Sequence, residues 1–178
     1  MKIRMGFVSN SSTSSFIIIG YNIPMENVMR SYEGFVDIRT EFPAIYHFMN
    51  RHKDILFKII NDNAEYKDYL PYYEYIFNND ESLKEAAIEV CNEYSLMDIL
   101  LIIDMICMEL KYDTRILFDG NYALNFGIIY NTGNGYTDDL NSFSYKLNDL
   151  IELFNSEDFV EFNKYYGSPK IISTEIEC

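Results

Sequence analysis

The sequence predicts an α+β fold, in which a small and mostly antiparallel sheet carries an inserted helical layer. Two observations lead to this prediction. Strand patterns lie at both ends of the chain and in one hairpin, whereas residues 40–110 show helical periodicity between them. The longest apolar run, residues 95–110, is interrupted by only three acidic side chains, which is typical of a helix in the middle of a fold.

The length of 178 residues favours a single domain over residues 1–178, with residues 40–110 as the helical layer within it. The N-terminus has no long apolar segment, so we expect no signal peptide. The three cysteines, Cys91, Cys107 and Cys178, are far apart and form no CxxC pattern. We expect buried thiols at Cys91 and Cys107 and a reducing compartment, the cytoplasm of a host cell.

The first strands flank a serine-rich stretch. Residues 2–8 read as a short strand, and residues 16–21, FIIIGY, as a buried strand because they are rich in β-branched side chains. Pro24 then suits the first turn of a short helix to about residue 32. Between the strands we expect a polar loop, because small hydroxyl and amide side chains cannot build a core: Ser9, Asn10, Ser11, Ser12, Thr13, Ser14 and Ser15.

The helical layer divides at two Asn- and Asp-rich breaks, residues 61–63 and 78–80, and its last helix follows the third directly. The four predicted helices are residues 40–62, 64–77, 80–94 and 95–110. Thr40 is the expected N-cap of the first, with Pro43 in its first turn, and Pro71 should bend or split the second.

The third and fourth helices begin with capping-box spacing, at Ser82 with Glu85 and at Ser95 with Asp98. In the fourth we expect Leu100, Ile103 and Ile106 to be buried.

The chain after residue 112 returns to strands. Residues 114–118 and 122–130 flank Asp-Gly-Asn, which predicts a hairpin. Helices are expected over residues 138–154 and 156–165, and a terminal strand over residues 171–176.

The formal net charge of −14 at pH 7 limits the classes of partner. So acidic a surface repels nucleic acid and anionic membranes, and the 95–110 run is too short and too charged to span a bilayer. We therefore expect no direct nucleic-acid binding, no membrane contact and a protein partner that is electropositive. The pattern indicates no oligomeric state.

No arrangement of residues indicates catalysis. His47 and His52, the two histidines, are five residues apart and would point in different directions on a helix, so we expect no metal site, cofactor or histidine-based catalytic residue. Asp98 and Asp104 have two interpretations. Burial could raise their pKa values for acid–base work, or they could cap the helix and bond a polar edge; we favour the second.

Acidic side chains recur every four residues in the third helix, at Glu81, Glu85, Glu89 and Glu93. They would form one row, with about 6 Å of helical rise between neighbours. The spacing resembles that of phosphates along a nucleic-acid strand, so the row could face a nucleic-acid-binding protein. The alternative is a solvated helix face on an acidic protein.

Tyrosines crowd the second helix, at Tyr66, Tyr69, Tyr72, Tyr73 and Tyr75. Tyrosine is favoured at interfaces because it brings contact area at low entropic cost, so Tyr72 and Tyr73 are candidate contact residues. The alternative places these side chains in the core and edge of the helical layer.

The segment Arg4-Met5-Gly6-Phe7-Val8-Ser9-Asn10-Ser11-Ser12-Thr13-Ser14-Ser15-Phe16 resembles the R-x-GFVSNSSSSSF opening of small uncharacterised phage-associated proteins, with Thr13 in place of one serine. The resemblance covers roughly the first twenty residues and implies a phage or prophage origin; it implies no activity.

A second resemblance joins three short patterns. Ser12-Thr13-Ser14 resembles the STS triplet of ADP-ribosyltransferases, and Arg4 and Glu175-Ile176-Glu177 resemble the arginine and the E-x-E pair of those enzymes. Two departures stand against it: Arg4 lies very near the triplet, and the acidic pair lies at the chain end.

These observations favour a non-catalytic accessory protein of phage or prophage origin that binds a host or virion protein through an acidic or tyrosine-rich surface. A small enzyme of the ADP-ribosyltransferase type and a virion structural component, which would place the protein in the virion, are the alternatives.

Overall fold

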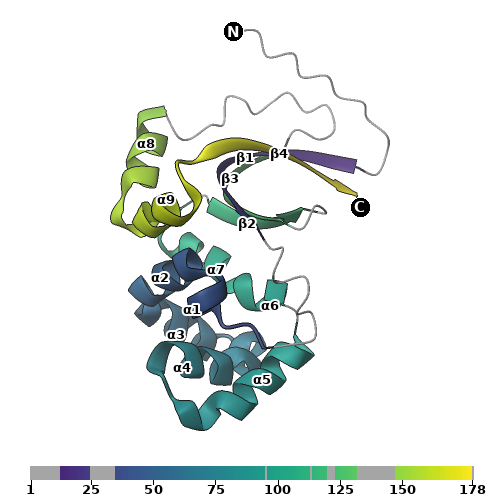
Figure 1. Ribbon diagram of the computed structural model, residues 1–178, viewed down its shortest axis with the longest axis vertical. Helices are drawn as coiled ribbons and strands as arrows, with labels where there is room; N and C mark the ends of the chain where they lie inside the picture. Colours follow the sequence, from purple (N-terminus) through teal and green to yellow (C-terminus); the bar gives the residue numbers. More distant parts are fainter. Residues whose placement is uncertain are drawn as a thin grey trace.

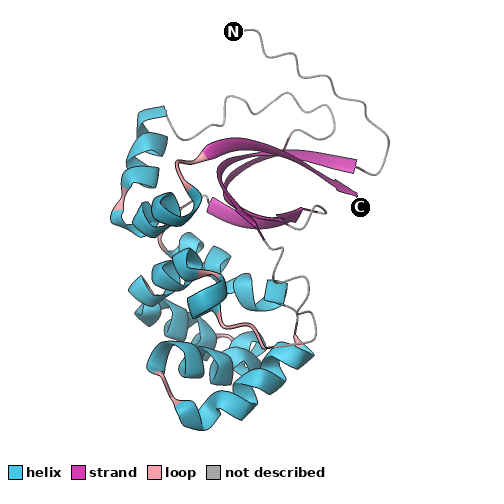
Figure 2. Cartoon of the chain, in the orientation of Figure 1, coloured by secondary structure: helices cyan, strands magenta, loops and turns pink. Residues whose placement is uncertain are grey.

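The structure, a computed structural model, describes residues 13–24, 35–94, 96–112, 114–119, 123–131 and 147–177. It confirms the α+β fold: a four-stranded antiparallel sheet lies beside a stack of helices, and two further helices lie against the sheet (Figures 1 and 2). Within the described ranges, no helix combines the length and apolar character that a membrane crossing needs.

The sheet contains β1 (Thr13–Pro24), β2 (Thr114–Asp119), β3 (Ala123–Asn131) and β4 (Lys170–Glu177) in the order β2-β3-β1-β4. The predicted strands near residues 114–118, 122–130 and 171–176 are confirmed. The predicted strand at residues 2–8 lies outside the described residues.

Strand β1 is longer than the predicted strand at both ends. Thr13, Ser14 and Ser15 were predicted in the polar loop but lie in the strand, where the ladder runs from Thr13 opposite Glu177 to Gly20 opposite Lys170. Hydrogen bonding along this ladder outweighs the local preference of Ser and Thr for turns. Pro24 ends the strand instead of beginning a helix. The rest of that predicted helix lies outside the described residues.

The sheet is strongly curled, as Figure 1 shows, and Cα atoms of the edge strands β2 and β4 come within 8 Å of each other. Two glycines lie opposite each other where β1 and β3 approach closely. A Cβ atom on Gly20 would lie 2.6 Å from the Cα of Gly127, and one on Gly127 would lie 2.7 Å from the Cα of Gly20. Only glycine fits such an approach.

The helical layer contains shorter helices than predicted: α1 (Ile38–Glu41), α2 (Pro43–Arg51), α3 (Lys53–Asp62), the 3₁₀ segment η2 (Ala64–Tyr69), α4 (Leu70–Asn78), the 3₁₀ segment η3 (Glu81–Leu83), α5 (Lys84–Glu93), α6 (Leu96–Leu100) and α7 (Ile102–Glu109). The predicted helix over residues 40–62 is three helices. It is broken at Phe42, because a residue before proline avoids the helical region, and again at His52.

Two predicted caps are wrong. The layer starts at Asp37, whose carboxylate accepts from the backbone N–H of Arg39, and not at Thr40. The third helix is capped by Asp80, which accepts from the N–H of Ser82, so Ser82 is not the cap. Asp37 and Asp80 supply the capping acceptor three and two residues earlier than predicted. The predicted split near Pro71 is confirmed, since η2 precedes α4.

The predicted helix over residues 95–110 is divided by a turn at Leu101 into α6 and α7. Its central place is confirmed, because Leu100, Ile103 and Ile106 are fully buried. Cys107 is buried as predicted, whereas Cys91 is only partly buried.

The C-terminal helices are α8 (Leu147–Asn155), the 3₁₀ segment η5 (Glu157–Phe159) and α9 (Val160–Tyr166). Residues 138–146 of the predicted helix lie outside the described residues. An aromatic cluster joins the parts of the fold, with Phe159 and Phe162 stacked on Phe126 of β3 and in contact with Phe48 of α2. The buried apolar cluster therefore extends from the sheet through both helical parts.

Candidate functional site

The acidic row lies on the outer face of α5 and on η3. Glu81, Glu85, Glu89 and Glu93 are all exposed, while Ala87 and Val90 on the opposite face are buried. Among the ion pairs formed between described residues, none includes these four carboxylates. The row is therefore a run of solvent-facing carboxylates that form none of these ion pairs, with Lys84 as a neighbouring cation.

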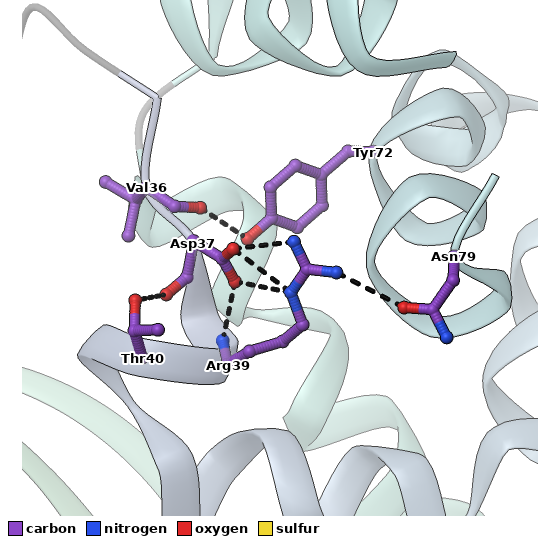
Figure 3. A network of polar contacts seen from close by, with 6 residues as sticks. All are labelled: Val36, Asp37, Arg39, Thr40, Tyr72 and Asn79. Carbon is purple, nitrogen blue, oxygen red and sulfur yellow. Dashed lines mark hydrogen bonds and ion pairs between the residues drawn. The ribbon is translucent and has the colours of Figure 1, made fainter. Parts of the chain in front are cut away.

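The turn that leads into the row is held by a polar network (Figure 3). The Arg39 guanidinium bonds Asp37 through Nε and Nη2, at 2.8 Å and 2.6 Å, and Nη1 donates to Oδ1 of Asn79 at 3.3 Å. The hydrogen bonds to Asp37 raise the pKa of Arg39 above its ordinary value. Asn79 is in the left-handed region, with φ of 55°, and ends α4. The network thus fixes the place from which η3 and α5 depart.

The prediction that Tyr72 and Tyr73 are contact residues is wrong, because both are fully buried. The Tyr72 hydroxyl donates to the carbonyl of Val36 at 2.9 Å, and the Tyr73 hydroxyl donates to the carbonyl of Ile99. Burial raises the pKa of both hydroxyls well above the ordinary value. Tyrosine suits such sites when its hydroxyl finds a buried carbonyl, so the core interpretation holds for this pair.

The other tyrosines of the stretch also belong mainly to the core. Tyr69 and Tyr75 are buried, and Tyr66 is partly exposed. The Tyr69 ring packs on Tyr94, the C-cap residue of α5, with centroids 4.7 Å apart. Of the two predicted contact surfaces, the acidic row and the tyrosine-rich stretch, the acidic row is therefore the exposed one.

The serine-rich segment is described only in part. Arg4 and residues 9–12 lie outside the described residues, so the polar loop and the phage-type motif are not placed. The β1–β4 register brings Thr13 opposite Glu177 and Ser15 opposite Glu175. Two of the three patterns that resemble ADP-ribosyltransferases are therefore adjacent, although more than 150 residues separate them in the sequence.

A polar cluster that the sequence did not reveal surrounds Asp158, the middle residue of η5. His52 Nε2 lies 2.8 Å from its Oδ1, the Tyr112 hydroxyl donates to its Oδ2 at 2.7 Å, and Arg51 Nε lies 3.6 Å from Oδ1. His47 is exposed on α2, so the two histidines have different environments. The partners of His52 are about a hundred residues away, and no local spacing signals them.

Asp104, one of the two acids of the central run, bonds a polar edge, as the favoured interpretation expected. Asp104 Oδ1 accepts from the backbone N–H of Ile116 on β2 at 2.8 Å, so it bonds a strand edge. Asp98 is partly exposed, and its expected capping partner Ser95 lies outside the described residues. No three His, Cys, Asp or Glu side chains in the described ranges are placed to hold a metal ion.

Comparison of the chain with protein-family models, curated proteins and solved structures finds no match.

Proposed function

We propose that the protein is a non-catalytic accessory protein of phage or prophage origin that binds an electropositive surface of a host or virion protein. The observation that carries the proposal is the exposed row Glu81, Glu85, Glu89 and Glu93 on a helix whose entry turn is fixed.

Physical chemistry favours a binding role for this row. Like charges four residues apart destabilise a helix by about 0.2–0.5 kcal/mol per pair, so the row carries a folding cost that binding would offset. Four carboxylates spaced by about 6 Å of rise suit a partner surface built to bind phosphates. Such complementarity raises the association rate and selects the partner more than it raises affinity.

The resemblance of the N-terminal segment to phage-associated proteins supports the proposed origin of the protein. It suggests a phage or prophage gene, in which small acidic proteins could act on nucleic-acid-binding proteins of the host or of the virion. Pull-down from host lysate with the wild-type chain would supply the partner for measurement.

The test removes two charges from the middle of the row. The double variant Glu85→Gln/Glu89→Gln keeps side-chain shape, and it should lower the association rate with the recovered partner and flatten its dependence on salt. Stopped-flow or biosensor kinetics over a range of sodium chloride concentrations measures both quantities.

A matched control removes two exposed helical carboxylates elsewhere, Glu109→Gln/Glu152→Gln on α7 and α8. This variant has the same net charge as the test variant. If the two variants associate equally slowly, the total charge and not the row steers binding. If the row variant binds as wild type does at every salt concentration, the row takes no part.

ADP-ribosyl transfer is the second candidate, because the β1–β4 register brings the triplet residue Thr13 opposite Glu177. The first proposal expects no catalysis, so incubation with labelled NAD and host lysate should leave no labelled protein. Labelling by the wild type that disappears in Glu177→Gln would replace the first proposal with the second.

A further inference from the structure

A pocket of about 340 Å³ opens between α2 and the η5–α9 segment. This volume is near the lower end of the range of small-molecule sites, which is roughly 300–1,000 Å³. The pocket is lined by His47, Phe48, Asn50, Arg51, Glu157, Asp158 and Glu161.

The two walls of the pocket differ in chemistry. The last turns of α2 present an imidazole, an amide and the Arg51 guanidinium, which can donate hydrogen bonds. The η5–α9 wall presents three carboxylates, which accept them. The pocket is therefore lined by hydrogen-bond donors on its α2 wall and by carboxylate acceptors on its η5–α9 wall. The four side chains of the row, in contrast, are all carboxylates.

The back of the pocket is rigid. The Asp158 side chain is only 11% exposed, and its two oxygens are engaged by His52 and the Tyr112 hydroxyl. Because Asp158 has these partners, it fixes the wall and holds Arg51 nearby, with Nε at 3.6 Å, and leaves ligand contact to other groups.

At the mouth of the pocket, the ion pair between Arg51 and Glu157 can be exchanged for contacts with a ligand. Arg51 Nη1 lies 2.7 Å from Glu157 Oε2, but these side chains are 46% and 85% exposed. Exposed ion pairs are weak, so a ligand that offers both charges can replace this one. Glu161, 28% exposed, bonds Lys164 through Oε2.

We propose that this pocket binds a small zwitterion of the free α-amino acid class. The ligand carboxylate pairs with the Arg51 guanidinium, and the ligand ammonium lies between Glu157 and Glu161. An anion alone would be repelled by the three carboxylates, which outnumber the one guanidinium of the lining. A simple cation would leave Arg51 without a carboxylate from the ligand, whereas a zwitterion can pair with both kinds of charge. The site is separate from the α5 row and does not depend on the proposed function.

The test titrates the common amino acids singly into isotopically labelled protein and follows backbone amide shifts by NMR. At least one should give saturable shifts at residues 47–51 and 157–161. The best ligand is then compared with its carboxamide, which lacks the carboxylate, and with its N-acetyl derivative, which lacks the ammonium. Each derivative should bind at least about tenfold more weakly.

Substitutions of the lining residues test whether the ligand binds in this pocket. Arg51→Gln and Glu161→Gln should each weaken binding about tenfold or more, whereas Glu89→Gln on α5 should leave it unchanged. Glu161 is partly exposed, so its variant keeps the test valid if Arg51→Gln disturbs folding. The proposal is overturned if no amino acid saturates, if both derivatives bind as well as the parent, or if Glu89→Gln weakens binding as much as Glu161→Gln does.

Discussion

Buried tyrosines act through both ring and hydroxyl in the helical layer. Tyr72 and Tyr73 fill adjacent positions of α4, and their rings meet edge to face with centroids 5.4 Å apart. Their hydroxyls reach backbone carbonyls of Val36 and Ile99, residues far away in the sequence. Each tyrosine therefore fills core volume and satisfies a buried acceptor, which a phenylalanine could not do.

Stability should fall as the pH rises above about 10, the ordinary pKa of tyrosine. Burial raises the pKa of Tyr73 well above that value and raises the pKa of Tyr166 to about 12. The folded state keeps these protons while the unfolded chain releases them, so their stabilisation is complete below about pH 10 and is lost above it. Each such tyrosine should contribute a slope of about 1.4 kcal/mol per pH unit.

Urea unfolding from about pH 9 to about pH 11.5 measures this slope. Tyr73→Phe should make the slope shallower by about one proton, because it removes one of the buried hydroxyls. Equal slopes in the wild type and Tyr73→Phe would contradict the prediction.

At the scale of elements, the β2 edge of the sheet is covered by a helix. The β2 edge lies beside α7, and Asp104 accepts the N–H of Ile116 there. A helix that covers a strand edge and bonds its N–H removes a site for unwanted strand pairing. The acid in the apolar α7 therefore has an architectural role at the β2 edge.

Asp104→Ala should lower the free energy of unfolding by about 1–3 kcal/mol, because it leaves the Ile116 N–H without this acceptor. Asp104→Asn keeps an acceptor oxygen and should lose less. Urea unfolding measures both losses, and hydrogen exchange at the Ile116 amide should accelerate in the alanine variant. If Asn and Ala cost the same, the negative charge and not the hydrogen bond is what matters.

At the scale of the whole molecule, the four exposed carboxylates of the row take no part in the ion pairs that the described residues form. Of the basic side chains described, Arg39 and Arg51 are paired with carboxylates, and Lys53 donates to the carbonyl of Phe77 at the end of α4. These contacts stabilise the joints between helices. They do not involve the row on η3 and α5, whose internal repulsion the neighbouring Lys84 relieves in part.

Moderate salt should therefore stabilise the folded protein. Raising sodium chloride from about 0.05 M to about 0.5 M shortens the Debye length from more than about 10 Å to less than about 5 Å and screens this repulsion. Three successive like-charge pairs suggest a gain of about 1 kcal/mol in the free energy of unfolding.

Urea unfolding at the two salt concentrations measures the gain. It should be smaller in Glu85→Gln/Glu89→Gln than in the wild type. A fall in stability with salt would show that ion pairs such as Arg51–Glu157 outweigh the repulsion.

The sequence by itself determined the α+β class, the β2–β3 hairpin, the terminal strand and the central place of residues 96–109. These features follow from local patterns: β-branched runs, an Asp-Gly-Asn turn and a long apolar segment. It also predicted that the carboxylates of the acidic row share one exposed face, because the four-residue spacing fixes the face once the helix forms; the row lies on α5 and, at Glu81, on η3.

Only the tertiary structure decided the secondary structure, burial and partners of several polar residues. It turned Thr13–Ser15 into a strand because β4 supplies a ladder, and it buried Tyr72 and Tyr73 because carbonyls of distant segments meet their hydroxyls. It also brought His52, Tyr112 and Asp158 together. Each of these outcomes depends on a partner many residues away, and local sequence preferences carry no information about such partners.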